Sequence, residues 1–222
     1  MYVEWYGQSA FRLTAGGTTV FIDPFGDMSA AAARGLRFEY PPIEGVAADL
    51  LLVTHEHSDH NATGAIAGSP AILRSTAGRL GSPVGEVLAV ASEHDAVAGT
   101  RRGPNTIFVF ELGGLRVAHF GDFGQAALRD EQAAAIGKVD LAFLPVGGGP
   151  TIGGEQAAAI AERIGARWIV PMHYGTHRVD FLAPADDFLA RMPAVHRTGA
   201  TGFETGDLPA GAQAIAIVPD AP

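Results

Sequence analysis

The sequence predicts an α+β protein in which helices flank two stacked, mixed β-sheets, an αββα sandwich. Short strand-like segments, split by glycine and rich in β-branched and aromatic residues, fill the first third of the chain. The continuous apolar run ADLLLVT (48–54) is typical of a strand buried on both faces. Strand-like and helix-like segments then alternate toward the end of the chain, which favours helices packed on the outer faces of the two sheets.

Each element follows from its local pattern. Apolar and β-branched runs bounded by glycine predict strands, and alanine-rich amphipathic runs predict helices. The predicted strands are YVEWYG (2–7), AFRLTA (10–15), TTVFID (18–23), ADLLLVT (48–54), AILRS (71–75), GEVLAVA (85–91), NTIFVFEL (105–112), LRVAHFG (115–121), VDLAFLPV (139–146), RWIVPMH (167–173) and AQAIAIVP (212–219). The predicted helices are NATGAIAG (61–68), GQAALRDEQAAAIG (124–137), GGEQAAAIAERIGA (153–166) and PADDFLARM (184–192).

The chain of 222 residues is expected to form a single domain, residues 1–222, because no linker or repeat divides it. Residues 24–46 are irregular, and a loop of this length is often functional. We expect this segment to be an active-site lid in which Phe25, Phe38 and Tyr40 cover a substrate. A surface excursion with its own apolar patch is an equally open alternative.

The composition excludes several classes of function. The net charge is −9, and the nearest approach to a basic run is the pair Arg101–Arg102, so no nucleic-acid partner is expected. There is no cysteine, which excludes disulfides and thiolate metal ligands. No apolar stretch approaches about 18 residues, and the N-terminal segment lacks a signal-peptide pattern. We therefore expect no membrane partner and a cytoplasmic location; nothing in the sequence sets the oligomeric state.

A dense group of ionisable residues, THEHSDH (54–60), directly follows the buried strand. In an extended segment the side chains of His55, His57 and Asp59 point the same way, whereas His60 must turn elsewhere. If these groups were buried without partners they would destabilise the fold, and a metal removes that cost. Imidazole and carboxylate ligands suit Zn²⁺, with Mn²⁺ and Fe²⁺ as alternatives. Four ligands in so short a segment fit two divalent ions, about 3.5–4 Å apart, better than one.

Two ions need further ligands, and these must come from later strand ends. His94 follows an apolar run in ASEHDAV, Asp122 follows a strand in VAHFGDFG, and His173 ends the strand WIVPMH. His119 lies in the same strand end as Asp122. On the residues alone, His94 and His119 both remain open as the third ligand of the first ion.

The segment THEHSDH matches the H-x-H-x-D-H signature, and the sequence resembles the metallo-β-lactamase superfamily. The short sequence motifs IDPF, HFGDFG, LPVGG and PMHYG are similar to those of the small metal-dependent hydrolases that include the UPF0173-type proteins. More distantly, the chain resembles the ascorbate-phosphate lactonases and the N-acyl-phosphatidylethanolamine phospholipase D family. The likeness runs from about Tyr2 to about Gly175 and implies the metallo-β-lactamase fold.

The resemblance also implies how two divalent ions would share the ligands. The implied set is His55, His57 and His94 for the first ion, Asp59, His60 and His173 for the second, and Asp122 as the bridge. His94 is preferred to His119 because His94–Asp95 matches the HD motif of the family. His119 is then expected beside the ligands. Asp59, which would steer a hydroxide, and His119 are the catalytic candidates.

Two further positions concern the surroundings of the ligands. Related sequences commonly read GHSAF where this one reads GQSAF, so Gln8 stands in place of a histidine. Gln8 keeps a donor and an acceptor but cannot titrate, so function survives if this position orients a ligand and the mechanism differs if it moves protons. Asp23, in IDPF, is a candidate to orient a histidine, and a turn residue before Pro24 is the alternative.

The predicted function is hydrolysis. Two divalent ions lower the pKa of bound water to about 7, so a bridging hydroxide would attack a small ester, lactone or phosphodiester. Because the ions outweigh the two carboxylate ligands, an anionic small-molecule substrate is favoured. The alternatives are a non-catalytic metal-binding module and an RNA or nucleotide phosphodiesterase of the same superfamily. A di-iron redox enzyme is disfavoured, since that variant usually has Glu where His57 stands, and no G-x-S-x-G motif of a serine hydrolase is present.

Overall fold

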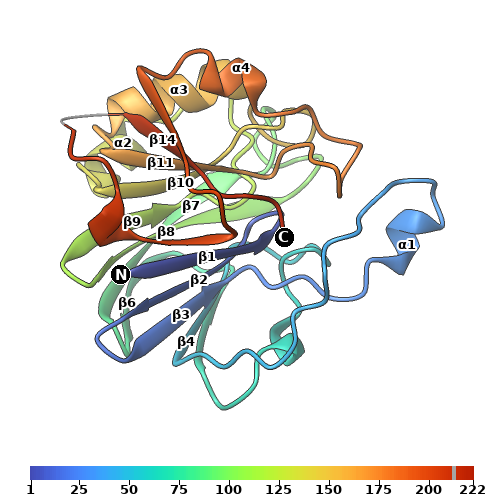
Figure 1. Cartoon of the computed structure of the whole chain (residues 1–222), viewed down its shortest axis with the longest axis horizontal. Helices are drawn as coiled ribbons and strands as arrows, with labels where there is room; N and C mark the ends of the chain where they lie inside the picture. Colours follow the sequence, from blue (N-terminus) through green and yellow to red (C-terminus); the bar gives the residue numbers. More distant parts are fainter. Residues whose placement is uncertain (212–213) are drawn as a thin grey trace.

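Two β-sheets stacked face to face form the body of the protein (Figure 1). The computed structural model describes residues 1–211 and 214–222, and within them fourteen strands make up the two sheets. The N-terminal sheet has the strand order β13-β1-β2-β3-β4-β5, and the C-terminal sheet has the order β12-β14-β11-β10-β9-β8-β7-β6. The predicted α+β class with two stacked sheets is therefore confirmed.

The elements have the following bounds. The strands of the N-terminal sheet are β1 (Tyr2–Gly7), β2 (Ala10–Ala15), β3 (Thr18–Ile22), β4 (Leu50–Val53), β5 (Ala71–Arg74) and β13 (Gly202–Glu204). Those of the C-terminal sheet are β6 (Gly78–Ser82), β7 (Gly85–Glu93), β8 (Pro104–Leu112), β9 (Leu115–His119), β10 (Leu141–Pro145), β11 (Trp168–Met172), β12 (Ala194–Arg197) and β14 (Ile215–Val218). The helical elements of the described residues are α1 (Ser29–Ala32), α2 (Asp130–Ile136), α3 (Gly154–Arg163), α4 (Asp186–Leu189) and the 3₁₀ turns η1 (Thr63–Ala65) and η2 (Thr205–Asp207).

Both sheets are mixed, as predicted. In the N-terminal sheet β1, β2 and β3 pair antiparallel, whereas β3, β4 and β5 pair parallel. In the C-terminal sheet β6 to β9 are antiparallel, whereas β9, β10, β11, β14 and β12 are parallel. Every residue of β4, β10 and β11 is buried, which explains why these strands appear in the sequence as continuous apolar runs.

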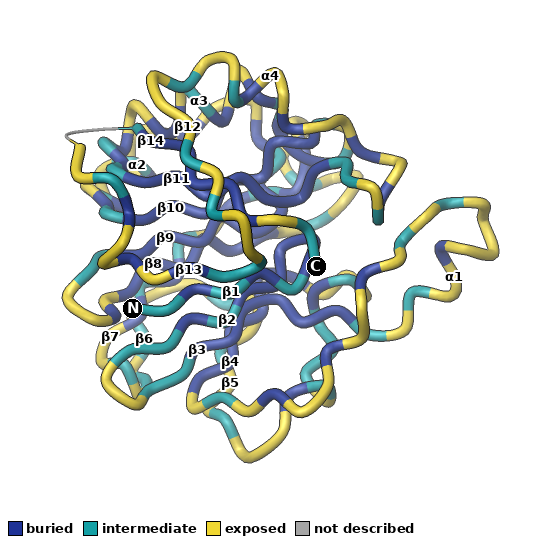
Figure 2. The backbone as a smooth tube through the Cα atoms, in the orientation of Figure 1, coloured by how far each residue is buried: buried dark blue, intermediate teal, exposed yellow. Residues whose placement is uncertain are grey.

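The main hydrophobic core lies between the two sheets. Phe11 of β2 packs against Phe143 of β10 in the facing sheet, with ring centroids 4.5 Å apart. Burial is concentrated in the central strands, and the connecting segments are mostly exposed (Figure 2). Because side chains alternate along a strand, β4 contributes two of its leucines to this core and turns Leu51 and Val53 to the opposite face.

A second apolar cluster covers the outer face of the N-terminal sheet. The irregular segment after β3 contributes Phe25, Tyr40 and Ile43, which pack with Phe21 and Leu51 of the sheet. Helices α2 and α3 contact strands of the C-terminal sheet, and α4 packs on α3, while α1 projects to one side (Figure 1). On the outer face of the N-terminal sheet an irregular segment therefore takes the place of the predicted flanking helix.

The predicted lid, residues 24–46, belongs to this second cluster. The rings of Phe25 and Tyr40 are buried, and Phe38 packs on both, with centroid distances of 5.2 and 5.3 Å. Phe38 also pairs with Val179 in the loop after β11. The segment therefore carries its own apolar patch, which is the alternative interpretation, and its action as a lid stays a prediction.

Helices are shorter than the sequence predicts. The predicted helix 124–137 is confirmed only over α2: the N–H of Gly124 donates to the carbonyl oxygen of Glu93 at 2.9 Å, and the side chain of Gln132 caps the helix start by accepting from the N–H of Arg129 at 3.0 Å. The predicted helix 184–192 is reduced to α4, and residues 61–68 contain only the single turn η1. None of the described helices has the length and hydropathy that crossing a membrane requires.

The predicted strands are found with small changes at their ends. Ala212 and Gln213, at the start of the last predicted strand, lie outside the described residues. Strands β6, β12 and β13 have no counterpart in the prediction. Most of their residues are exposed or half-buried, so the alternation of buried and exposed positions that indicates a strand is weak in them.

Candidate metal centre

All seven predicted metal ligands converge at the ends of four strands. The segment from His55 to His60 follows β4, His94 follows β7, Asp122 lies just after β9, and His173 follows β11. Loops that leave strand ends are positioned by the sheets beneath them, which is why sites are commonly built there. The stacking of the two sheets brings these four strand ends together.

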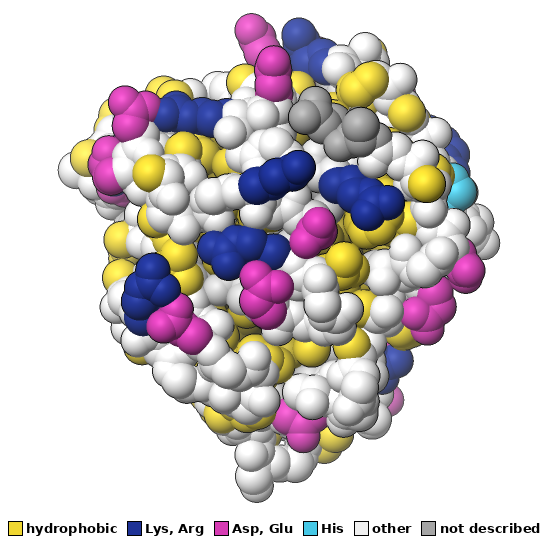
Figure 3. All heavy atoms as spheres, turned by 90° about the vertical axis from the view of Figure 1, so that its left-hand side faces the viewer, with side chains coloured by type: hydrophobic (Ala, Val, Ile, Leu, Met, Phe, Trp, Pro, Cys, Tyr) yellow, Lys and Arg dark blue, Asp and Glu magenta, His cyan; other side chains and the backbone are white. Residues whose placement is uncertain are grey.

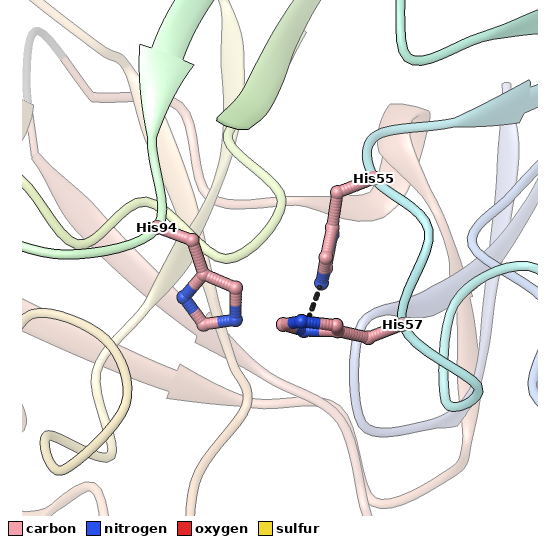
Figure 4. Close-up of side chains that lie close together, drawn as sticks. All are labelled: His55, His57 and His94. Carbon is pink, nitrogen blue, oxygen red and sulfur yellow. Dashed lines mark hydrogen bonds between the residues drawn. The ribbon is translucent and has the colours of Figure 1, made fainter. Parts of the chain in front are cut away.

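The first ligand group consists of His55, His57 and His94. One ring nitrogen of each lies within 4.8 Å of those of the other two. The Nε2 of His55 is 3.1 Å from the Nδ1 of His57, and the three rings are turned toward one another (Figure 4). His57 is exposed, whereas the other two side chains are buried, so solvent reaches this group from the side of His57.

The second ligand group consists of Asp59, His60 and His173. Their ligand atoms also lie within 4.8 Å of one another. The Nε2 of His60 is 3.5 Å from Oδ2 of Asp59. Both histidines are buried, and Asp59 is half-buried. Asp59 is therefore the member of this group that solvent or a substrate can reach.

Asp122 lies between the two groups. Its Oδ2 is 3.1 Å from the Nε2 of His94 in the first group and 3.1 Å from the Nε2 of His173 in the second. Its Oδ1 is 3.3 Å from the Nε2 of His60. A carboxylate that faces ligand atoms of both groups has the position that a bridge between two ions requires.

Asp23 and Thr54 orient two of the imidazoles from behind. The carboxylate of Asp23 accepts a hydrogen bond from Nδ1 of His60 at 3.0 Å and another from the Thr54 hydroxyl at 2.7 Å. That hydroxyl then accepts from Nδ1 of His55 at 3.0 Å. With the protons assigned to Nδ1 by these bonds, each Nε2 keeps its lone pair for a metal. The predicted orienting role of Asp23 is confirmed for His60.

His94 is oriented in the same way, because its Nδ1 donates to the carbonyl oxygen of Pro150 at 3.1 Å. On the inner side of the cluster, the Nε2 of His60 is buried and has no well-aligned hydrogen-bond partner in residues 1–211 and 214–222, although Oδ1 of Asp122 lies 3.3 Å away. A buried nitrogen without a partner destabilises a fold unless a bound species uses it. Imidazole nitrogens and carboxylate oxygens are ligands of zinc, manganese and iron, so the residues present fit such ions.

The groups of the site influence one another strongly. Burial and the neighbouring His60 lower the pKa of His55 to about 2. Burial also disfavours the charged form of His60, but the surrounding carboxylates, first that of Asp122, raise its pKa well above the ordinary value. Burial disfavours the charged form of Asp122, but the imidazoles of His173 and His60 hold its pKa well below the ordinary value. A proton on His60 thus offsets the carboxylate charge, and a cation would take over this role.

The backbone is strained at three positions around the cluster. Gln8, Asp23 and His173 have φ angles of 50°, 50° and 51°, in the left-handed region that such side chains rarely adopt. Strain of this kind persists only where the surrounding structure enforces it, and it is concentrated at functional sites. Glycine is required beside His173, because a β-carbon on Gly147 would lie 2.3 Å from the carbonyl oxygen of His173.

His94, and not His119, joins the first ligand group. His119 is completely buried; its Nε2 donates to the carbonyl oxygen of Ser9 at 3.0 Å, and its Nδ1 accepts from the N–H of Gly121 at 3.2 Å. A histidine whose two ring nitrogens are both occupied by the backbone has no nitrogen left for a substrate or an ion. The predicted catalytic role of His119 therefore does not fit its position, which is that of a structural histidine beside the ligands.

Asp95, the second residue of the HD motif, anchors the loop that follows His94. Its carboxylate accepts hydrogen bonds of 2.8–2.9 Å from four main-chain N–H groups, those of Val97, Gly99, Arg101 and Arg102. Burial disfavours the charged form of Asp95, but these donors together lower its pKa to about 2. The motif thus combines a predicted metal ligand, His94, with the anchor of the adjoining loop.

Three groups that touch the ligands are absent from the sequence-based prediction: the Thr54 hydroxyl, the Ser9 hydroxyl and the Pro150 carbonyl. Ser9 Oγ donates to Oδ1 of Asp122 at 3.4 Å. A hydroxyl placed between an apolar strand and a ligating histidine was a usable signal for Thr54. The Pro150 contact has no such signal, since it is made by the main chain.

The fold and the site together define a class of protein: a sandwich of two mixed sheets whose strand ends carry a cluster of histidines and aspartates able to bind metal. A family model described as "Beta-lactamase superfamily domain" matches residues 2–173. A UPF0173 metal-dependent hydrolase of Nitratidesulfovibrio vulgaris is 32% identical over 205 residues, covering 80% of this chain and 81% of the relative. One from Pyrobaculum arsenaticum is 31% identical, covering 94% and 99%.

The chain belongs to the UPF0173 family of metal-dependent hydrolases in the beta-lactamase superfamily, which confirms the resemblance seen in its motifs. Among solved structures, a metallo-beta-lactamase superfamily protein of Thermotoga maritima has 30% sequence identity and a TM-score of 0.78. That match covers 99% of both chains. The likeness therefore extends over the whole sandwich, including the strands after β11.

Proposed function

We propose that this protein is a dinuclear-metal hydrolase that cleaves a small ester, lactone or phosphodiester, with zinc as the favoured metal. The position of Asp122 carries the proposal, because its carboxylate faces imidazole nitrogens of both ligand groups at 3.1 Å. The names of the relatives agree with it: the curated relatives are called metal-dependent hydrolases, and the Thermotoga protein is a candidate zinc-dependent hydrolase.

The residues of this chain would divide the work as follows. Two divalent cations would supply hydroxide at neutral pH and polarise the carbonyl or phosphoryl oxygen of the centre under attack. The buried histidines His55, His60 and His94 would hold their positions through the hydrogen bonds of their Nδ1 atoms. Exposed His57 and half-buried Asp59 mark the side from which a substrate approaches. Asp59, as a carboxylate on that side, would orient the attacking water by accepting its proton in a hydrogen bond.

An anionic substrate is favoured by a cavity that adjoins His94. The cavity has a volume of about 630 Å³, and its lining includes Pro150, Arg101 and Arg102. None of the seven predicted ligands lines this cavity, which borders the site through the Pro150 carbonyl, the group that accepts from Nδ1 of His94. Within the described residues neither arginine side chain forms an ion pair, whereas Arg74 and Arg129 are paired with glutamates. Unpaired guanidinium groups suit a carboxylate or phosphate of a small substrate.

A nucleic-acid substrate is disfavoured by the charge distribution. The net charge of the chain is −9. On the face drawn in Figure 3, Lys and Arg side chains are interspersed with Asp and Glu and form no continuous basic stripe. A small-molecule substrate, no membrane partner and a cytoplasmic location are accordingly part of the proposal.

Metal loading and turnover test the proposed function. We expect the purified protein to bind two divalent ions per chain, measured by elemental analysis, and to turn over chromogenic esters, lactones or phosphodiesters. Chelation should abolish turnover, and zinc should restore it, because the nucleophile depends on the ions. Two bound ions without turnover of any such substrate would favour a non-catalytic module, and bound iron with oxidase activity would favour a redox enzyme.

The anionic substrate has its own test. Combined Arg101→Ala and Arg102→Ala substitutions should raise KM for anionic substrates by about tenfold or more, since hydrogen bonds to charged groups contribute about 1.5–3 kcal/mol each. The kcat should be nearly unchanged, and neutral esters of the same acid should be unaffected. Arg79→Ala, which replaces an exposed arginine of β6 outside the lining of this cavity, is the matched control. Equal effects on neutral and anionic substrates would contradict this part of the proposal.

A further inference from the structure

Gln8 lies in the tight connection between β1 and β2. Its side chain is completely buried, and its φ of 50° is unusual for a residue with a side chain. The preceding Gly7 has a φ of 111°, and a β-carbon there would lie 2.3 Å from the ring of Tyr40. Close packing therefore holds the backbone next to Gln8 in one conformation.

Gln8 contacts two of the three members of the second ligand group. Its side-chain Nε2 donates to Oδ2 of Asp59 at 3.3 Å. Its main-chain carbonyl accepts from the N–H of His173 at 3.2 Å and from Nε1 of Trp5 at 3.1 Å. Because Trp5 is itself buried, the carbonyl that holds His173 is anchored in the core.

Asp59 is the member of this group that most needs an anchor. It is half-buried, whereas His60 and His173 are enclosed by the fold. Besides His60, whose Nε2 lies 3.5 Å from Oδ2 of Asp59, Gln8 is the side chain of the described residues that hydrogen-bonds this carboxylate, at the same oxygen. The other end of the same amide, Oε1, is buried and has no partner there. The amide is therefore held by its donor end, which points to the contact with Asp59 as the reason for its presence.

We propose that Gln8 is a positioning residue of the second metal site, whose amide holds the Asp59 carboxylate in the orientation in which it ligates an ion. The inference rests on the proposed two-metal site. An amide suits this task because it donates a hydrogen bond to a carboxylate without adding a positive charge that would compete with the ion. It also leaves the negative charge of Asp59 available to the metal.

Three variants test the proposal by metal binding, without reliance on activity. Gln8→Gly removes the side chain and is unstrained at a φ of 50°. Gln8→His restores a donor, because Nε2 of histidine is as many bonds from the backbone as Nε2 of glutamine. Gln132→Ala is the matched control, since Gln132 is also a buried, hydrogen-bonded glutamine but belongs to α2.

Each metal-free protein is titrated with zinc in competition with a chromophoric chelator, and the absorption spectrum of the cobalt-loaded form reports the ligand geometry. In Gln8→Gly we expect one of the two affinities to fall about 10–100-fold, as is typical when a partner of a metal ligand is lost, and the other to stay within about threefold. The cobalt spectrum should change for the same site. Gln8→His and Gln132→Ala should bind both ions as the wild type does.

The possible failures are distinguishable. Wild-type affinities for both ions in Gln8→Gly would overturn the positioning role while leaving the two-metal proposal intact. Loss of affinity in Gln8→His equal to that in Gln8→Gly would overturn the role of the hydrogen-bond donor. A wild-type protein that binds fewer than two ions would overturn the proposed function, and this inference with it.

Discussion

Replacing Asp122 with asparagine should lower kcat/KM of the metal-loaded protein by at least about 10³-fold, equivalent to about 4 kcal/mol of transition-state stabilisation. The carboxylate faces His94 and His173 at 3.1 Å and is completely enclosed by the site. An amide keeps the shape but loses the negative charge, and its NH₂ end cannot ligate a cation. At least one ion should therefore be lost, which elemental analysis of the variant measures together with the kinetics.

Asp140→Asn is the matched control for this substitution. Asp140 accepts a hydrogen bond from the N–H of Arg116 at 2.9 Å, far from the ligand groups, and its replacement should leave both metal content and kcat/KM near the wild-type values. An Asp122→Asn protein that retained two ions and most of its activity would show that this carboxylate does not bridge the ions.

Replacing Asp23 with asparagine should destabilise the protein by about 2–4 kcal/mol and weaken zinc binding by about 10–100-fold. Asp23 is completely buried and accepts three hydrogen bonds, from the N–H and hydroxyl of Thr54 and from Nδ1 of His60. Asparagine tolerates the φ of 50°, so backbone strain does not confuse the result. Its NH₂ group would, however, face a donor of Thr54 or His60, which leaves buried donors without an acceptor.

The free energy of unfolding in urea, measured with and without zinc, tests this prediction. Asp49→Asn is the control, because Asp49 is an exposed aspartate that accepts one backbone hydrogen bond, from Thr19, away from the site. It should change the stability by less than about 0.5 kcal/mol, as is usual for substitutions away from a buried network. If the two variants had the same free energy of unfolding, the hydrogen bonds that link Asp23, Thr54 and His55 would contribute no more to stability than the single hydrogen bond of Asp49.

Much of the fold could be predicted from local patterns of apolar and polar residues. The uninterrupted apolar runs of β4, β10 and β11 predicted buried strands, and each of them is buried at every position. The packing on the outer face of the N-terminal sheet could not be predicted, because an irregular segment covers this face and its aromatic residues Phe25 and Tyr40 follow no periodic pattern. The short strands β6, β12 and β13 were missed because most of their residues are exposed or half-buried, which leaves little alternation of buried and exposed positions; β13 also depends on pairing with β1, which is remote in sequence.

The residue types and the spacing in THEHSDH are local properties of the sequence. They were enough to predict, without a structure, that the protein carries a metal-site motif at the end of a strand. Only the tertiary structure decided which of His94 and His119 joins it, that Asp122 stands between the two groups, and that Gln8 reaches Asp59. These facts depend on distances between segments far apart in the chain. Such distances are set by how the two sheets stack and where their strands end, and no local pattern of residues encodes them.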